Sequence, residues 1–233
     1  MSENIKKTTK AFRVDLDSRE NQSILKPSTR CSNNQVHQIN EAAKKIDKLI
    51  KNAPYSNDDI ILKRNEIKEA FFSPFKPQLK NAQVFLSHSH ADRNKALKVK
   101  DYLEENLDTE CVFIDSLFWD YKDNVLNELA ECDDISKIKD AFTLILRESL
   151  QDMIEKCPYF VFLQSKNSVS LNQGLSQITY SAWIYEELKI AHSISESRPI
   201  PMMESMQVFH DISLFLESFE TITLKKLSQQ INS

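Results

Sequence analysis

Short apolar runs alternate with amphipathic helical segments over the C-terminal two thirds of the chain, and this alternation restricts the possible folds more than any other feature of the sequence. The runs that we expect to form strands are residues 82–87, 111–115, 159–164, the proline-bearing run 198–203 and a short segment near 221–224. The segments with helical periodicity are residues 92–105, 123–132, 138–156, 181–193 and 223–231. Buried strands that alternate with helices are typical of a parallel sheet covered by helices on both faces. We therefore expect an α/β fold with a central parallel sheet.

The part of the chain that precedes these strands has a different character. Residues 1–34 are polar with weak periodicity, and we expect them to be disordered. Residues 35–78 show apolar side chains at steps of three or four before a proline-bearing linker, which predicts an N-terminal helical appendage. The α/β domain is then expected to span residues 79–233.

Composition and charge exclude several classes of function. The formal net charge is −4 and the basic clusters have acidic neighbours, so we expect no nucleic-acid partner. The N-terminus is polar and no apolar stretch approaches the ~20 residues that span a bilayer, so we expect neither a secretory leader nor a membrane partner. The four cysteines form no CxxC pair and fit no metal-ligand spacing, which predicts a reducing, cytoplasmic location and no metal site.

The chain contains a single glycine, Gly174. The glycine-rich phosphate loops GxGxxG and GxxxxGK[ST] therefore cannot occur, and a bound nucleotide must be held by other groups. In open parallel sheets, ligands bind beyond the carboxyl ends of the strands. The segments in which to look for a site are thus residues 87–92, 115–122 and 165–181.

Three sequence motifs stand at these positions. Residues 84–92 read VFLSHSHAD, residues 112–115 read VFID and are followed by Trp119, and residues 181–188 read SAWIYEEL. Together they resemble the TIR (Toll/interleukin-1 receptor) domain, in which an FISxS..D box, a strand ending in aspartate and an SxWxxxEL helix follow in this order. The resemblance covers about residues 81–224, and it is closer to prokaryotic stand-alone versions than to animal receptors. The loop after the strand-end aspartate lacks the glycine often found there.

The resemblance implies a flavodoxin-like TIR fold and cleavage of NAD+ to nicotinamide and ADP-ribose or a cyclised relative. The catalytic residue of the family is the glutamate of SxWxxxE, which corresponds to Glu187. NAD+ is then a substrate, and no separate cofactor is expected. The resemblance also implies self-association through TIR surfaces and a role in anti-phage defence, either by depleting NAD+ or by making a signal for a separate effector protein.

The chemistry of the bond can be compared with the residues present. On a helical wheel of about 100° per residue, Glu187 lies at the edge of the apolar stripe on the side of Trp183, whereas Glu186 lies nearly opposite the stripe and is expected at the solvated surface. The nicotinamide nitrogen is already cationic and leaves neutral, so the reaction needs no general acid, unlike most sugar hydrolysis. One carboxylate can then stabilise an oxocarbenium-like transition state.

Other side chains at the strand ends and on the helix can hold the dinucleotide. The residues that we expect to contact NAD+ are Ser87, His88, Ser89, Asp115, Trp119 and Trp183. Hydroxyl and imidazole groups can hydrogen-bond phosphate or ribose together with backbone N–H groups at a helix start, the carboxylate can bind a ribose diol, and an indole can stack on a base. Structural alternatives stay open for Trp183 as core filler and for Asp115 as a turn residue, and Asp92 is interpreted as a helix N-cap.

Two other functions compete with NAD+ cleavage. The first is a non-catalytic scaffold that self-associates and signals, and the second is a related nucleotide N-glycosidase. A scaffold should tolerate loss of Glu187, and a nucleotide glycosidase should prefer a mononucleotide. The sequence leaves open whether the product is linear or cyclic.

Overall fold

The computed structural model describes residues 9–25, 44–49, 51–52, 55–56, 59–60, 64–72, 81–107, 112–115, 124–125, 127, 135–196 and 209–233. The chain divides into two compact units. The first unit comprises residues 1–29, 81–116 and 151–233, and the second comprises residues 30–80 and 117–150.

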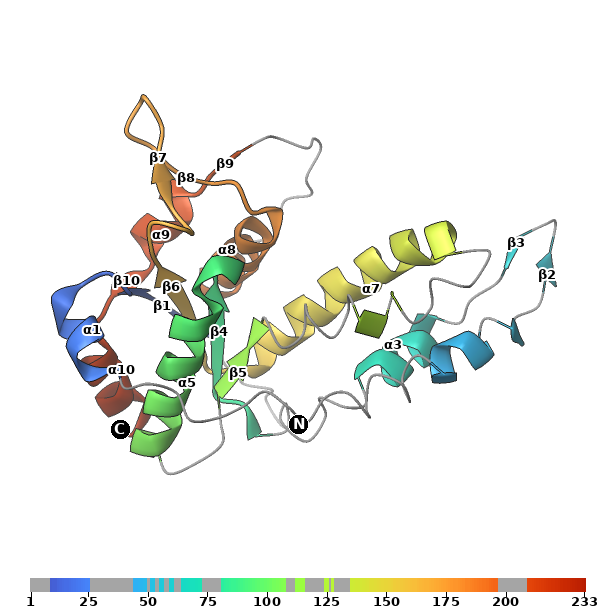
Figure 1. Cartoon of the computed structure of the whole chain (residues 1–233), viewed down its shortest axis with the longest axis horizontal. Coiled ribbons are helices and arrows are strands. Elements are labelled where there is room, and N and C mark those ends of the chain that lie inside the picture. The colour runs from blue at the N-terminus through green and yellow to red at the C-terminus, as the bar shows by residue number, and fades with distance from the viewer. Residues whose placement is uncertain are drawn as a thin grey trace, which may run out of the picture. The chain divides into compact units, whose positions relative to one another are not determined.

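A five-stranded parallel sheet organises the first unit (Figure 1). Its strands, in spatial order, are β10 (Glu220–Thr221), β1 (Lys10–Asp15), β6 (Tyr159–Gln164), β4 (Val84–His88) and β5 (Val112–Ile114). All four neighbouring pairs are parallel, and helices flank the sheet. The expected α/β fold with a central parallel sheet is thus confirmed, and the strand order is compatible with a flavodoxin-like arrangement.

The observed strands match the predicted strands in the middle of the chain and differ from them at its start. β5 and β6 lie within two of the predicted runs, β4 extends one residue beyond the predicted run 82–87, and β10 begins one residue before the predicted fifth strand. The predicted run 198–203 lies outside the described residues. The strand between β6 and β10 is instead β1, which comes from the segment that we expected to be disordered.

The N-terminal segment is ordered because its side chains alternate between core and surface. Phe12 and Val14 of β1 and the following Leu16 are at most 2 % exposed, which is the period of a strand. The next helix, α1 (Arg19–Ile24), ties this strand to the C-terminal end of the chain. The buried Asn21 donates to the carbonyl of Asp15 at 2.7 Å and accepts from the N–H of Leu224 at 3.0 Å. The expectation of disorder therefore does not hold for this part of residues 1–34.

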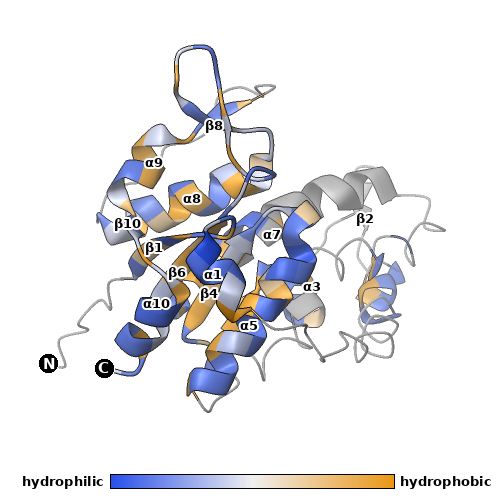
Figure 2. Cartoon of the chain, turned by 60° about the vertical axis from the view of Figure 1, so that its left-hand side comes forward, coloured by the Kyte–Doolittle hydropathy of each residue, from blue (hydrophilic) through white to orange (hydrophobic). Residues whose placement is uncertain are grey.

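Two long helices cover the strands that carry the candidate site. α5 (Arg93–Leu107) contacts β4 and β5, whereas α8 (Ala182–Ser195) contacts β1, β4 and the short helix α9 (Ser213–Ser218). The last helix, α10 (Leu224–Ile231), packs on α5. Figure 2 shows the largely hydrophobic strands β4 and β6 within this unit and a hydrophilic side on α10. α5 and α10 thus bury one side and expose the other, as helical periodicity predicts, whereas α8 is buried over most of its surface.

A row of phenylalanine rings crosses the sheet on one face. Phe85 stacks on Phe113 at 5.7 Å between ring centroids and on Phe160 at 5.8 Å, and all three are register partners in neighbouring strands. Phe219 then packs edge-on against Phe160. Because side chains alternate along a strand, Ser87 lies on the same face as Phe85. This face is directed toward α8, as the contact described below establishes.

A small antiparallel sheet contains β7 (Ser170–Leu171), β8 (Gln177–Thr179) and β9 (His210–Asp211). β7 and β8 lie between β6 and α8 along the chain, in the segment 165–181 in which we looked for a site, and β9 follows α8. Ser181 then begins α8, since its hydroxyl accepts a hydrogen bond from the N–H of Ile184 at 3.2 Å. This N-cap fixes where the helix starts and hence which of its residues meet β4.

The described residues of the second unit form helices and one short hairpin. Residues 44–49 and α3 (Arg64–Phe72) are helices, and β2 (Tyr55–Ser56) pairs with β3 (Asp59–Ile60). The expected helical appendage of residues 35–78 thus includes a hairpin, and α3 begins after it. A further long helix, α7 (Ile135–Lys156), starts in this unit and continues into the first unit, close to the predicted range 138–156.

Candidate functional site

The candidate site lies where the direction of the strand order reverses. From β4 the chain enters β5 on one side, and it returns to β6 on the other side of β4. In open α/β sheets, ligands bind at the carboxyl ends of the strands at such a switch point. Ser87 and His88 end β4, and Ser165 follows β6 directly. The residues to be considered therefore lie in the loops that follow β4, β5 and β6.

Ser87 and Glu187 meet at the end of β4. The hydroxyl of Ser87 donates a hydrogen bond to Oε2 of Glu187 at 2.5 Å, although the two residues are 100 positions apart. Both residues are 0 % exposed. Ser87 belongs to the strand, and Glu187 belongs to the second turn of α8. The contact brings the first and third TIR-like motifs together and places a carboxylate inside the protein.

His88 and Asp115 form a second buried contact at the same edge. Nδ1 of His88 lies 2.5 Å from Oδ1 of Asp115, and their side chains are only 1 % and 5 % exposed. The two groups are not aligned as a hydrogen bond, and within the described part of the chain Nε2 of His88 has no hydrogen-bond partner. The contact joins the first and second TIR-like motifs. Because Asp115 faces an imidazole, it is more than a turn residue.

Asp92 joins the start of α5 to the loop after β6. Its buried carboxylate accepts a hydrogen bond from the hydroxyl of Ser165 and another from the side-chain amide of Asn167 at 2.9 Å. Lys95 Nζ lies 3.5 Å away. Asp92 directly precedes α5, as an N-cap would, and its carboxylate also contacts the loop after β6.

Asp17 extends this network to the loop after β1. Its carboxylate accepts hydrogen bonds from Lys95 Nζ and from the backbone N–H of Lys166, both at 3.0 Å. The bond from Lys95, followed by that from Lys166, lowers the pKa of Asp17 below its usual value of 3.8. The same contact with Asp17 raises the pKa of Lys95. The loops after β1, β4 and β6 are thus held together by two aspartates.

Glu186 is buried, so the expectation of a solvated residue is wrong. It is 7 % exposed, and its Oε1 lies 3.6 Å from Nζ of Lys189, which is 1 % exposed. Burial, and secondarily the charge of Glu186, raises the pKa of the neighbouring Tyr185, whose ring stacks on His210. The helical wheel predicted the wrong environment for Glu186 because α8 packs against the sheet on one side and against α9 on another. The face opposite the apolar stripe is therefore not open to solvent.

The other residues predicted to contact NAD+ are Ser89, Trp183 and Trp119. Ser89 is half-buried and precedes the short helix η2 (His90–Asp92), without a capping bond from its side chain. Trp183 is half-buried on the first turn of α8. Trp119 lies outside the described residues. The structure therefore forms three separate buried contacts at this sheet edge: Ser87 with Glu187, His88 with Asp115, and Asp92 with Ser165. Ser87 and His88 are adjacent in β4, so their side chains point to opposite faces of the sheet.

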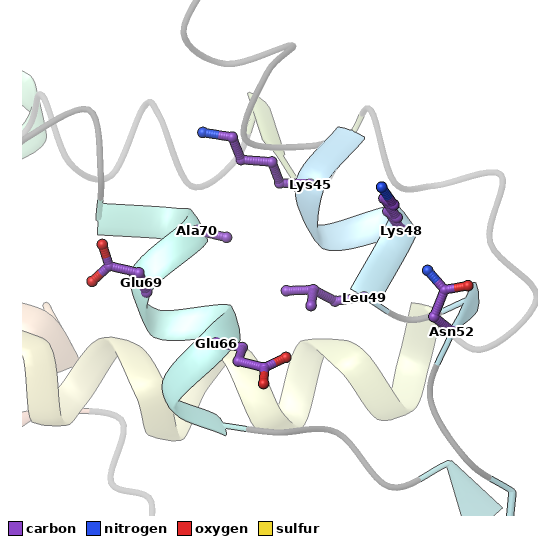
Figure 3. A pocket seen from close by; sticks show the side chains of 7 residues that line it. All are labelled: Lys45, Lys48, Leu49, Asn52, Glu66, Glu69 and Ala70. Carbon is purple, nitrogen blue, oxygen red and sulfur yellow. The ribbon is translucent and has the colours of Figure 1, made fainter.

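A pocket occurs in the second unit, and none of the residues that line it is a predicted site residue. It has a volume of about 400 Å³ and lies between the helix of residues 44–49 and α3 (Figure 3). Figure 3 shows Leu49 and Ala70 pointing toward one another across it, with Lys48, Glu66 and Glu69 nearby. The lining is a mixture of apolar contacts and opposite charges, as is common where two amphipathic helices meet.

Two absences hold for the described parts of the chain alone. They contain no group of three or more histidine, cysteine, aspartate or glutamate side chains placed to hold a metal ion. They also contain no helix that is both long and apolar enough to cross a membrane.

The fold and the site define a parallel α/β protein with a buried serine–glutamate pair at the carboxyl edge of its sheet. Comparison with known proteins extends this no further, because no family model, no curated protein and no solved structure matches the chain.

Proposed function

We propose that this chain is a TIR-type enzyme that cleaves the nicotinamide–ribose bond of NAD+, with Glu187 as its catalytic carboxylate. The observation that carries the proposal is the hydrogen bond between Ser87 and Glu187. It unites two of the three motifs on which the resemblance rests, at the sheet edge where α/β proteins bind ligands. Without the resemblance, nothing in the sequence would single out this glutamate.

One carboxylate is sufficient for the proposed reaction. The C–N bond breaks with its electron pair moving to the pyridinium nitrogen, and nicotinamide leaves as a neutral molecule. Positive charge then develops on the ribose, and an ionised Glu187 stabilises it at close range in a site from which water is excluded. Water, or a hydroxyl group of the ADP-ribose itself, completes the reaction and gives a linear or a cyclic product.

The neighbouring side chains have supporting parts in the proposal. Ser89 and the backbone N–H groups at the start of η2 come directly after β4, and they are the proposed phosphate-binding groups. Trp183 and Trp119 are the proposed stacking residues. Asp115 already contacts His88, so binding of a ribose diol by Asp115 requires that it exchange this partner for the sugar.

The burial of Glu187 adds a condition to the proposal. Because Glu187 is 0 % exposed, side chains around it must move before a substrate can reach it. Activation by self-association through TIR surfaces would supply such a change, and it fits a defence protein that is silent until triggered. In that setting, the enzyme acts in the cytoplasm and either depletes NAD+ or produces a signal for a separate effector.

The experiment is a measurement of nicotinamide release from NAD+ by concentrated protein, with chromatography of the second product. Glu187→Gln should abolish release while the protein stays folded. Glu186→Gln is the matched control, because it changes the adjacent buried carboxylate on the same helix and should keep turnover within about threefold of the wild type. Release from nicotinamide mononucleotide in preference to NAD+ would indicate a nucleotide glycosidase instead.

The burial of Glu187 also favours one alternative function. A carboxylate fixed by a strand serine inside the protein can serve to attach α8 to the sheet, as in a scaffold that signals through assembly alone. No nicotinamide release under crowding or forced assembly, together with no rise in melting temperature on adding NAD+, would select this scaffold.

A further inference from the structure

The direction of the Ser87–Glu187 hydrogen bond restricts what Ser87 can do. A serine hydroxyl carries one proton, and here that proton is donated to Oε2 of Glu187 at 2.5 Å. Ser87 is 0 % exposed, as Glu187 is, and in this structure its hydroxyl is committed to the carboxylate. A role in hydrogen-bonding phosphate or ribose, as the sequence suggested, would require the hydroxyl to abandon the carboxylate.

The environment of Glu187 creates a need for such a donor. Removing a carboxylate from water favours its neutral form, whereas a hydrogen bond donated to it favours the ionised form. Hydrogen bonds to an ionised group are roughly twice as strong as neutral ones. A neutral carboxyl cannot stabilise positive charge on the ribose, so a fully buried catalytic glutamate depends on its donors.

The backbone around Ser87 makes it a rigid donor. Ser87 lies in β4 opposite Phe162 of β6, and its strand is paired on both sides. A group held by a paired strand is placed more accurately than a group on a loop. The N-cap at Ser181 fixes the start of α8 and thereby the position of Glu187. Strand and helix therefore present the two side chains to each other in a defined geometry.

We propose that Ser87 is a positioning residue that orients Glu187 and keeps it ionised, and that it does not contact the substrate. The catalytic meaning of this inference rests on the proposed function, but the effect of Ser87 on the ionisation of Glu187 does not. The two can therefore be tested separately on the full-length chain.

The experiment measures the ionisation of Glu187 and the turnover of NAD+ in the same set of variants. Glutamate labelled with carbon-13 at the side-chain carboxyl reports ionisation by NMR, and the signal of Glu187 is identified by its absence in Glu187→Gln. In Ser87→Ala, this signal should titrate at a pH about one unit or more higher than in the wild type. The acidic limb of the pH–kcat profile should move by the same amount, and KM should stay within about twofold.

Two further variants separate positioning from packing. Ser87→Thr keeps the hydroxyl and should restore the wild-type titration, whereas Ser193→Ala removes another buried serine, on the same helix as Glu187, and should leave it unchanged. If Ser87→Ala does not fold, Ser87→Cys replaces it. The thiol is similar in size and a weaker donor, so an intermediate shift is expected.

Each outcome supports or overturns the inference. An unchanged titration of Glu187 in Ser87→Ala or Ser87→Cys overturns it, and so does a raised KM with unchanged kcat, which would make Ser87 a substrate ligand. A shifted titration in a protein whose wild type never cleaves NAD+ would remove the proposed enzyme function while leaving the assignment of Ser87 intact.

Discussion

Asp92 accepts a hydrogen bond from the hydroxyl of Ser165, and this contact fastens the start of α5 to the loop that follows β6. Both residues are buried, at 2 % and 4 % exposure. The contact spans the switch point between β4 and β6, so it holds together the two loops between which a ligand would bind. Its removal should therefore affect stability and the candidate site together.

Asp92→Ala should lower the free energy of unfolding by about 2–4 kcal/mol, because it leaves the buried hydroxyl of Ser165 and the amide of Asn167 without their acceptor. Urea unfolding followed by circular dichroism measures this. Asp152→Ala, at an exposed aspartate, should change stability by less than about 0.5 kcal/mol. Equal losses in the two variants would show that the Asp92 network does not stabilise the fold.

Asp17→Asn should cause a small loss of stability whose size depends on pH. The pKa of Asp17 is lowered, so its interactions stabilise the fold in full above the unfolded value of 3.8 and are lost as the pH falls through the lower folded value. Since Asp17 and Lys95 are both about one third exposed, the loss at neutral pH should stay below about 1 kcal/mol. Stability curves of wild type and variant should converge in strong acid, and a constant gap would contradict this assignment.

Tyr185 should ionise later than the other tyrosines. Burial raises the pKa of its phenol above 10.0, and the charge of Glu186 adds to the effect. The folded state then keeps a proton that the unfolded state loses, so Tyr185 contributes stability below pH 10 that disappears as the pH rises through the folded value. An ultraviolet titration should lose its latest phase in Tyr185→Phe but not in Tyr180→Phe, since Tyr180 is 66 % exposed.

Val14→Ala should cost about 2 kcal/mol of stability, because Val14 is 0 % exposed in a strand paired on both sides. Lys10→Ala, at an exposed position of the same strand, serves as the control and should change stability little. Thermal unfolding distinguishes the two. If both variants melt like the wild type, β1 is not an internal strand of the sheet.

Local periodicity was a good guide wherever each element meets the core on one side. The ranges of β4, β5, β6 and α7 follow from the spacing of their apolar residues, since that spacing depends on neighbours along the chain. The alternation of Phe12, Val14 and Leu16 was present in the sequence too, but the surrounding polar residues obscured it. Its place between β6 and β10 could not follow from any local pattern.

In the candidate site too, the sequence selected the residues and the tertiary structure decided their contacts. The resemblance selected Glu187, Ser87, His88 and Asp115 by position in three motifs, and the TIR assignment itself stays a prediction. The tertiary structure decided how they pair, because Ser87 meets Glu187 across 100 residues and His88 turns to Asp115.

The sequence by itself determined the α/β class and the strand ends at which polar groups collect, because both depend on patterns repeated over a few residues. The tertiary structure alone decided that β1 enters the sheet, that Glu186 is buried and that Ser87 donates to Glu187. Each of these depends on which distant segment covers a given side chain, and local periodicity indicates only that a side chain is buried, not which distant segment buries it.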